Sequence, residues 1–255
     1  MNVPSKLVFL LCLTFMNVGR ILATELTVSA AVSLKPALEE LAKVYEADKR
    51  DKLSFNFGAS GALQQQIENG APVDVFISAA SKQMDALAAK SLILNETRKI
   101  LVGNKLVLVI PKGTSDIGSF EDLKKSSVKR VAVGDYKTVP AGQYAQETLA
   151  SLKLTDAVTQ KLVQGNSVRQ VLTYVELKEV DAGLVYSSDA FDSTKVAVVA
   201  TALPKWHTPI VYPIAVLKKS KSPIEAKRFV GWLASNIASD VFKKHGFIVG
   251  SDAPH

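Results

Sequence analysis

Strand patterns and helix patterns alternate along this chain, and the alternation limits the fold more than any other feature of the sequence. The segment 25–30 alternates apolar and polar residues, and the segments 53–57 and 73–77 are bounded by turn residues in the way of buried strands. Each is followed by a segment whose apolar residues recur at helical spacing. A repeated strand–helix–strand order predicts an α/β fold with mostly parallel sheets flanked by helices.

Two long apolar segments, 100–110 and 210–217, divide this pattern into two blocks. We interpret them as the places where the chain crosses between two domains. The prediction is a discontinuous first domain, 25–104 and 210–255, with a second domain, 105–209, inserted into it. Two crossing strands form a hinge, and the cleft between such domains is a common ligand site.

The N-terminus has the features of a secretory signal. Lys6 precedes a short apolar run, 7–15, and the small residue Ala23 precedes a polar stretch. We predict that residues 1–24 are a signal peptide, cleaved near Ala23, and that the protein is located in the periplasm. A membrane anchor is the alternative, but it needs ~20 apolar residues. Cleavage would also remove Cys12, the only cysteine, so the mature protein would have neither a disulfide nor a reactive thiol.

Charge and histidine content exclude several classes of function. The 255 residues include 31 Lys and Arg against 24 Asp and Glu, a formal charge of +7, but the basic residues are scattered. Without a clustered basic patch we expect no nucleic-acid partner. His207, His245 and His255 lack the spacing of a metal site, and GxSxG, GxGxxG and phosphate-loop motifs are absent from the sequence. We therefore expect no enzyme activity and no cofactor.

Small or hydroxyl residues stand where strand patterns end and helix patterns begin. Helix N-termini carry unpaired N–H groups and a partial positive charge. In an open parallel sheet they lie at the carboxyl edge of the strands, where ligands bind. Several of them facing one cleft would bind an anion without Lys or Arg. The positions selected in this way are Ser33, Ser60, Ala141, Val168 and Tyr186.

Each position also has a purely structural interpretation. Ser33 and Ser60 would serve as helix N-caps, the commoner role for serine at such a place. Val168 would be a core residue, and Tyr186 a half-buried strand residue with its hydroxyl in water. Taken singly, the positions do not separate these interpretations from an anion site.

Ordered blocks spread over the whole mature chain resemble the periplasmic molybdate-binding proteins of ABC transporters, the ModA family. The blocks are 30–34, 57–61, 66–78, 132–135, 139–142, 168–169, 183–189, 212–213 and 242–247. The resemblance implies a two-domain periplasmic-binding-protein fold of type II. It also implies a monomeric protein that captures molybdate, and tungstate, in the interdomain cleft and delivers it to the permease of an ABC transporter.

The resemblance assigns a role to each selected position. Ser33 and Ser60 would supply hydroxyl and backbone N–H donors, Ala141 and Val168 backbone N–H donors, and Tyr186 its hydroxyl. The metal atom would be held only through the oxygens of the oxyanion. The same five positions come from the argument about helix ends.

A site made only of donors suits molybdate and tungstate, which are fully deprotonated dianions near neutral pH. Phosphate retains a proton at that pH and would need an acceptor, and the closed cleft would select against the smaller sulfate. One departure from the family is that Gly61-Ala62 follow Ser60 where further hydroxyl residues are expected.

Two alternatives remain open from the sequence. The same fold would bind another ligand, such as sulfate, an organic anion or chelated iron. An exported hydrolase or transferase would use Ser60 as a nucleophile, but it needs a histidine base close by.

Overall fold

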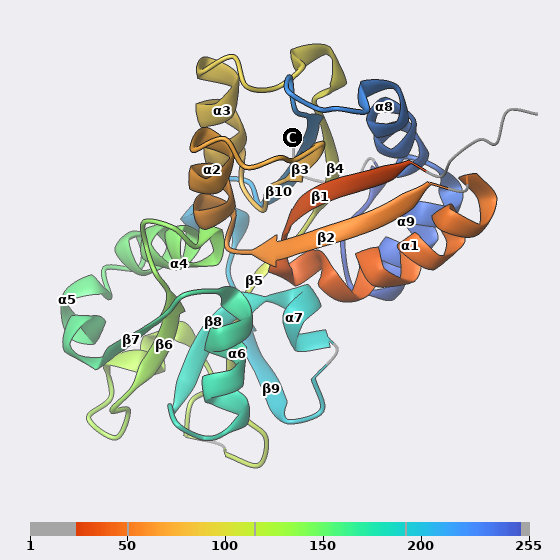
Figure 1. Ribbon diagram of the computed structural model, residues 1–255. Helices are drawn as coiled ribbons and strands as arrows, with labels where there is room; N and C mark the ends of the chain where they lie inside the picture. Colours follow the sequence, from red (N-terminus) through yellow and green to blue (C-terminus); the bar gives the residue numbers. More distant parts are fainter. Residues whose placement is uncertain (1–23, 50, 115, 192, 251–255) are drawn as a thin grey trace, which may run out of the picture.

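The computed structural model describes residues 24–49, 51–114, 116–191 and 193–250. Within these residues the strands form two five-stranded sheets flanked by helices (Figure 1). The predicted α/β class is confirmed. The predicted signal peptide and its cleavage point near Ala23 lie outside the described residues.

The elements fall into two groups by the sheet to which they belong. The first group is β1 (Glu25–Ala31), η1 (Val32–Leu34), α1 (Lys35–Lys49), β2 (Lys52–Gly58), α2 (Ser60–Glu68), β3 (Val75–Ile77), α3 (Ser81–Ala89), η2 (Asn95–Thr97), β4 (Lys99–Gly103), β10 (Val211–Val216), α8 (Pro223–Trp232) and α9 (Asn236–Lys244). The second group is β5 (Leu106–Pro111), η3 (Phe120–Lys124), β6 (Val131–Gly134), α4 (Pro140–Ser151), α5 (Thr155–Val158), η4 (Thr159–Lys161), β7 (Leu162–Gly165), α6 (Val168–Glu176), β8 (Ala182–Tyr186), α7 (Ser187–Phe191), β9 (Val196–Thr201) and η5 (Pro204–Trp206).

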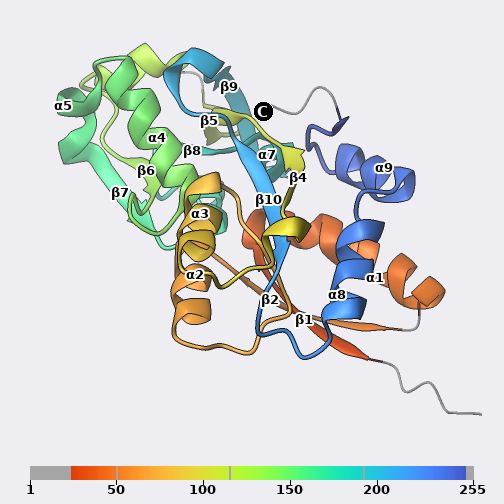
Figure 2. The ribbon, with the colours of Figure 1, turned by 90° about the horizontal axis from the view of Figure 1, so that it is seen from above.

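The two sheets have the same topology. Their strand orders are β2-β1-β3-β10-β4 and β7-β6-β8-β5-β9. In each sheet one strand, β10 or β5, pairs antiparallel with both of its neighbours, and the other strands run in one direction. Each sheet is therefore mostly parallel, as predicted. In Figure 2, α2 and α3 lie on one side of the first sheet and α1 and α8 on the other.

The chain passes between the sheets twice. Asn104 and Lys105 join β4 to β5, and residues 202–210 join β9 to β10. The apolar segment 100–110 is thus two strands in different sheets rather than one crossing strand. These sheet changes fall where the sequence analysis divides the chain, while the division into two domains stays a prediction.

The antiparallel strands explain the two long apolar segments of the sequence. Every residue of β5 and of β10 is buried. A strand covered by helices on both faces has no polar side, so its sequence is continuously apolar rather than alternating.

The sequence pattern predicts a helix near residues 155–163, and this prediction is wrong in its second half. Helix α5 ends at Val158, a 3-10 turn follows, and Leu162–Gly165 form strand β7. This strand pairs in parallel with β6 alone and lies at the edge of its sheet. Because most of β7 is only half-buried or exposed, it has little of the apolar pattern by which a strand is recognised.

None of the helices in the described part of the chain is both long enough and apolar enough to cross a membrane.

Candidate functional site

Strands of both sheets end at one small cavity. Strands β1, β2 and β3 approach it from the first sheet and β6, β7 and β8 from the second, all by their carboxyl ends. Its lining consists of Ala31, Val32, Ser33, Gly58, Ala59, Ser60, Ala79, Val139, Pro140, Ala141, Val168 and Tyr186. All five positions selected from the sequence are in this lining. The structure therefore brings together residues that are far apart in the chain.

The two serines lie at the starts of helical segments, but neither caps its own helix. Ser33 is in the 3-10 turn η1, and Ser60 is the first residue of α2. The N-cap residues are Ala31 and Ala59, and no side-chain capping bond is present at either end. The hydroxyl of Ser60 instead accepts a hydrogen bond from the backbone N–H of Ala79 at 2.9 Å. The N-cap interpretation of the two serines is wrong.

The second sheet contributes two helix N-termini and a strand end. Pro140 opens α4, where its missing N–H costs nothing, and Ala141 follows it. Val168 is the first residue of α6, whose N-cap Ser167 accepts from the backbone N–H of Gln170. First-turn N–H groups have no partner within their own helix, so they are available to a ligand. Tyr186 ends β8 and is 1% exposed, so its hydroxyl is not in bulk water.

The cavity is small and its lining lacks charge. No residue in its lining carries a charged side chain. Its volume is about 10 Å³, which is room for roughly one water molecule. A four-oxygen anion is larger, so the walls must move apart to admit it. The donors that remain are hydroxyls, backbone N–H groups and the positive ends of helices.

A backbone contact joins the two groups next to the cavity, between neighbours of the lining residues Ser60 and Val139. The N–H of Gly61 donates to the carbonyl of Thr138 at 2.9 Å, which joins α2 of the first group to the loop before α4 of the second. Asp135 shapes that loop, because its Oδ1 accepts from the N–H and the hydroxyl of Thr138. These bonds lower the pKa of Asp135, and the bond from the Thr138 hydroxyl has the largest effect. A Cβ on Gly61 would lie 2.6 Å from the Thr138 oxygen, so this approach requires glycine.

Sequence reasoning missed a buried polar chain behind Ser33. The Ser33 hydroxyl lies 3.0 Å from the Tyr212 hydroxyl, and Asn104 Nδ2 lies 3.2 Å from that same oxygen. Asn104 also donates to Ser188 at 2.8 Å. Register between β10 and β4 shifts at Tyr212 and Pro213, because proline cannot donate to the strand ladder. The Tyr-Pro pair inside an apolar strand was the one local signal of this feature.

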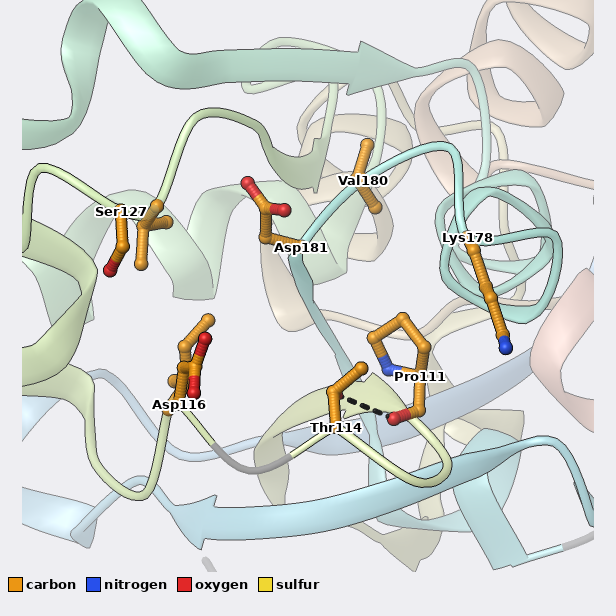
Figure 3. A pocket seen from close by; sticks show the side chains of 9 residues that line it. Pro111, Thr114, Asp116, Ser127, Lys178, Val180 and Asp181 are labelled. Atoms are coloured by element: carbon orange, nitrogen blue, oxygen red, sulfur yellow. Dashed lines mark hydrogen bonds between the residues drawn. The ribbon is translucent and has the colours of Figure 1, made fainter.

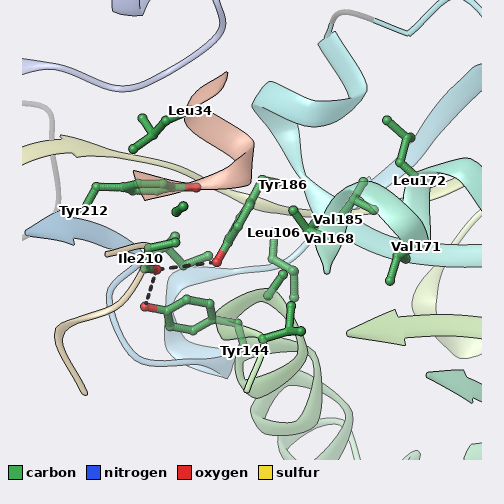
Figure 4. Packing of buried hydrophobic residues seen from close by; sticks show 14 of the residues in the cluster. Leu34, Leu106, Tyr144, Val168, Val171, Leu172, Val185, Tyr186, Ile210 and Tyr212 are labelled. Carbon is green, nitrogen blue, oxygen red and sulfur yellow. Dashed lines mark hydrogen bonds between the residues drawn. The ribbon is translucent and has the colours of Figure 1, made fainter. Parts of the chain in front are cut away.

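Three tyrosine rings pack behind the cavity (Figure 4). The ring centroids of Tyr186 and Tyr212 are 5.8 Å apart, and those of Tyr144 and Tyr186 are 6.4 Å apart. The hydroxyls of Tyr144 and Tyr186 both approach the carbonyl oxygen of Ala79, at 3.5 Å each. Burial raises the pKa of all three tyrosines, so at neutral pH they keep their protons and act as donors.

One carboxylate lies close to this cluster. Asp189 is 1% exposed and contributes to the raised pKa of Tyr186 and of Tyr212. Arg169, next to Val168, places Nη2 3.6 Å from Oδ1 of Asp189. The guanidinium offsets the negative charge, which would otherwise repel an anion in the cavity.

A roomier hollow, of about 170 Å³, lies elsewhere, between Pro111, Asp116, Lys178 and Asp181 (Figure 3). Asp181 precedes β8, so the hollow is at the opposite, amino edge of the second sheet. The Asp181 carboxylate already accepts hydrogen bonds from the backbone N–H groups of Lys129 and Arg130. None of the sequence-selected positions lines this hollow. Among the described residues no cluster of His, Cys, Asp and Glu is suited to a metal ion.

Comparison with known proteins adds a second, independent observation. The model of a family described as bacterial extracellular solute-binding proteins matches residues 26–248. YvgL of Bacillus subtilis, a substrate-binding lipoprotein assigned to an ABC transporter, is 46% identical over 224 residues, which cover 87% of this chain and 85% of that protein. The molybdate-binding protein ModA of Haemophilus influenzae is 39% identical over 230 residues, which cover 88% of this chain and 90% of that protein.

A solved structure with 42% identity points the same way. It is the substrate-binding domain of a protein from Clostridium difficile assigned to a molybdenum ABC transporter, and it superimposes with a TM-score of 0.71. The similarity covers 90% of this chain and 100% of that one.

Proposed function

The chain belongs to the bacterial extracellular solute-binding proteins and, among them, to the ModA family, and from that membership we propose that it binds molybdate, and tungstate with it, in the cavity between the two sheets. These families are binding proteins of transporters and not enzymes. In the periplasm, after signal-peptide cleavage near Ala23, the protein would act as a monomer and deliver the anion to an ABC permease.

One observation carries the proposal. Ser33, Ser60, Ala141, Val168 and Tyr186, chosen from sequence, line a single buried cavity without a charged side chain. A fully deprotonated dianion accepts hydrogen bonds on every oxygen, and this lining offers donors. Hydrogen bonds to a charged group are worth about 1.5–3 kcal/mol each after the exchange with water is counted, so a few of them would give a large binding free energy.

The two crossings between the sheets suit that closure. We propose that residues 25–104 and 210–255 move as one domain and residues 105–209 as the other, with the hinge at the crossings. Because the cavity of this structure is too small for the anion, the anion would enter a more open form, and the two halves would then close around it, bringing Gly61 back towards Thr138. The closed surface would then be the one that the permease recognises.

The experiment is thermal unfolding of the mature protein, stripped of bound anion, with molybdate, tungstate, sulfate or phosphate at equal concentration. A ligand present at 1,000 times its Kd adds about 4 kcal/mol of stability. For a chain of this size that raises Tm by roughly 8–16 °C. We expect such a rise with molybdate and with tungstate and little with the other two.

The remaining outcomes decide against parts of the proposal. A rise with sulfate alone would keep the binding fold and change the ligand. No rise with any of the four anions would contradict an oxyanion site. Mass spectrometry of the secreted protein reports the cleavage point, and light scattering reports whether it is a monomer.

A further inference from the structure

Both serine hydroxyls of the cavity have a hydrogen-bond partner inside the protein. For Ser60 the donor is the backbone N–H of Ala79, 2.9 Å away. A backbone N–H can only donate, so the Ser60 oxygen is the acceptor in this contact. Its own proton is then left for another partner, and Ser60 lines the cavity.

The chain behind Ser33 also begins at a backbone N–H. Lys105 donates its N–H to Asn104 Oδ1 at 2.9 Å, and this contact fixes which end of the amide is oxygen. Ser187 donates its hydroxyl to the same oxygen at 2.9 Å. The other end of the amide is therefore Nδ2, which faces Ser188 and Tyr212.

The direction of the next two bonds follows. Asn104 Nδ2 can only donate, so the Tyr212 oxygen accepts from it and the Tyr212 proton must point elsewhere. The Ser33 oxygen lies 3.0 Å from the Tyr212 oxygen, within reach of that proton. Tyr212 is fully buried, which removes bulk water as a competing partner. With Tyr212 as the donor in this contact, the Ser33 proton is directed to the cavity, like that of Ser60.

We propose that Asn104 and Tyr212 are positioning residues that hold Ser33 as a hydrogen-bond donor, so that the cavity takes anions without a proton and rejects those that carry one. This inference rests on the proposed oxyanion function and names what gives it selectivity.

The chemistry behind the selectivity is the two-way capacity of a hydroxyl. A free serine hydroxyl donates or accepts by rotating about its C–O bond. It would donate to molybdate and accept from the P–OH group of phosphate. A serine oxygen that already accepts from Tyr212 has its own proton directed at the ligand. The P–OH group would then face a second donor with no acceptor between them, which is unfavourable. Sulfate carries no proton near neutral pH, and the relay does not act against it.

The test is Tyr212→Phe, which removes the donor to Ser33 and leaves a ring of nearly the same shape. Isothermal titration near neutral pH measures Kd for molybdate, sulfate and phosphate. We expect molybdate to bind about 2- to 10-fold more weakly, the value of one neutral hydrogen bond. The preference for molybdate over phosphate should narrow by about tenfold, while that for molybdate over sulfate stays unchanged.

Tyr45→Phe is the matched control. Tyr45 is also fully buried and its hydroxyl donates to Asp51 at 2.9 Å, in a part of the first sheet's core that does not line the cavity. Its removal should leave all three dissociation constants unchanged. If the role of Tyr212 were purely structural, Tyr212→Phe would weaken the binding of all three anions equally.

Asn104→Asp is the second variant, and it keeps the inference testable if Tyr212→Phe folds poorly. The carboxylate still accepts from Lys105, but it now also accepts from Tyr212, so the relay runs backwards and Ser33 loses its donor. The added charge weakens the binding of every anion. The ratio of phosphate affinity to sulfate affinity therefore reports on the relay, and we expect this ratio to rise.

The outcomes separate the two claims. Wild-type protein that binds neither molybdate nor tungstate contradicts the proposed function. Wild-type protein that binds molybdate selectively, with unchanged phosphate-to-sulfate ratios in both variants, keeps that function and overturns the relay.

Discussion

Ser33 and Ser60 reach the cavity by different routes and end in the same chemical state. Ser60 is held by a backbone N–H two residues after strand β3, and Ser33 by a side-chain relay from the first crossing between the sheets. In both cases the oxygen is engaged from behind, so the proton points forward. A neutral residue thereby acts as a one-way donor without any Lys or Arg.

Replacing either serine by alanine should weaken molybdate binding. We expect Ser33→Ala and Ser60→Ala each to cost about 1–3 kcal/mol of binding free energy, the range for a lost hydrogen bond to a charged group. Ser60→Ala should also lower the free energy of unfolding, because it leaves the buried N–H of Ala79 without its acceptor. Titration calorimetry and urea unfolding measure the two effects separately.

Ser235→Ala is the control for these variants. Ser235 caps α9 by accepting from the N–H of Ala238, away from the cavity. Its loss should cost about 0.5–2 kcal/mol of stability and leave the molybdate Kd unchanged. Equal binding by both site variants and this control would remove Ser33 and Ser60 from the site.

At the scale of elements, the site depends on how closely helix starts approach strand ends. Helix α4 begins against the end of β6, and Gly142 in its first turn packs on Gly134. A Cβ on Gly142 would overlap the carbonyl oxygen of Gly134 and lie 2.9 Å from that of Asp135. This close packing brings the N-terminus of α4 to the cavity.

Gly142→Ala should therefore destabilise the protein. Overpacking against backbone costs about 1–3 kcal/mol, because neither partner is a flexible side chain. Gly231→Ala tests the opposite expectation: Gly231 lies inside α8 with no neighbouring heavy atom within 4 Å of the added methyl group. That variant should gain up to about 1 kcal/mol from helix propensity. Urea unfolding of the two proteins side by side decides the matter, and equal stability would refute the packing argument.

At the scale of the molecule, the contact between Gly61 and Thr138 joins the two sheets' groups of elements through their backbones. Glycine at this position departs from the hydroxyl residues expected after Ser60 in the family. The structure explains this departure, because only a residue without a Cβ permits the contact between Gly61 and Thr138.

Gly61→Ala should hinder closure of the two halves. The new Cβ would lie 2.7 Å from the Thr138 Cα and 2.6 Å from its oxygen, so the loop before α4 must retreat. We expect weaker molybdate binding through faster dissociation, with the unliganded stability nearly unchanged because the open form has no clash. Stopped-flow displacement measures the dissociation rate. An unchanged rate would mean that this contact does not take part in closure.

Stability at alkaline pH should follow the buried tyrosines. Burial raises the pKa of Tyr45 to about 12, and that of Tyr186 and Tyr212 well above its usual value. Below pH ~10 both folded and unfolded tyrosines are protonated, so this stabilisation is fully present. Above it the unfolded chain loses protons that the folded protein retains, so stability falls as pH rises towards the folded pKa values.

Urea unfolding between pH 9 and 11 should therefore show a steady loss of stability (about pH 10 is where free tyrosine titrates). Tyr45→Phe should lose less over that interval, because it contributes no proton difference. A slope equal to that of the wild type would argue against a raised pKa at Tyr45.

Molybdate binding should vary little between about pH 6 and 9, since no lining side chain titrates there in its usual range.

Local pattern was enough to predict the α/β class, the places where the chain changes sheets and the five positions that line the cavity. Each of these depends on signals within a few residues: strand alternation, helical spacing, or a small residue at a strand end. The edge strand β7 was lost to a helix prediction, because an exposed edge has no such signal.

Tertiary structure decided what lies behind those positions. Ser33 and Tyr212 are 179 residues apart in the chain, and Asn104 and Tyr212 are 108 apart. The direction of each hydrogen bond depends on the next partner, starting from a backbone N–H that has no alternative. No local pattern encodes such a chain of contacts, because hydrogen-bond direction is set by distance and geometry across the folded core. Composition and spacing selected the donors, and packing between distant segments determines where their protons point.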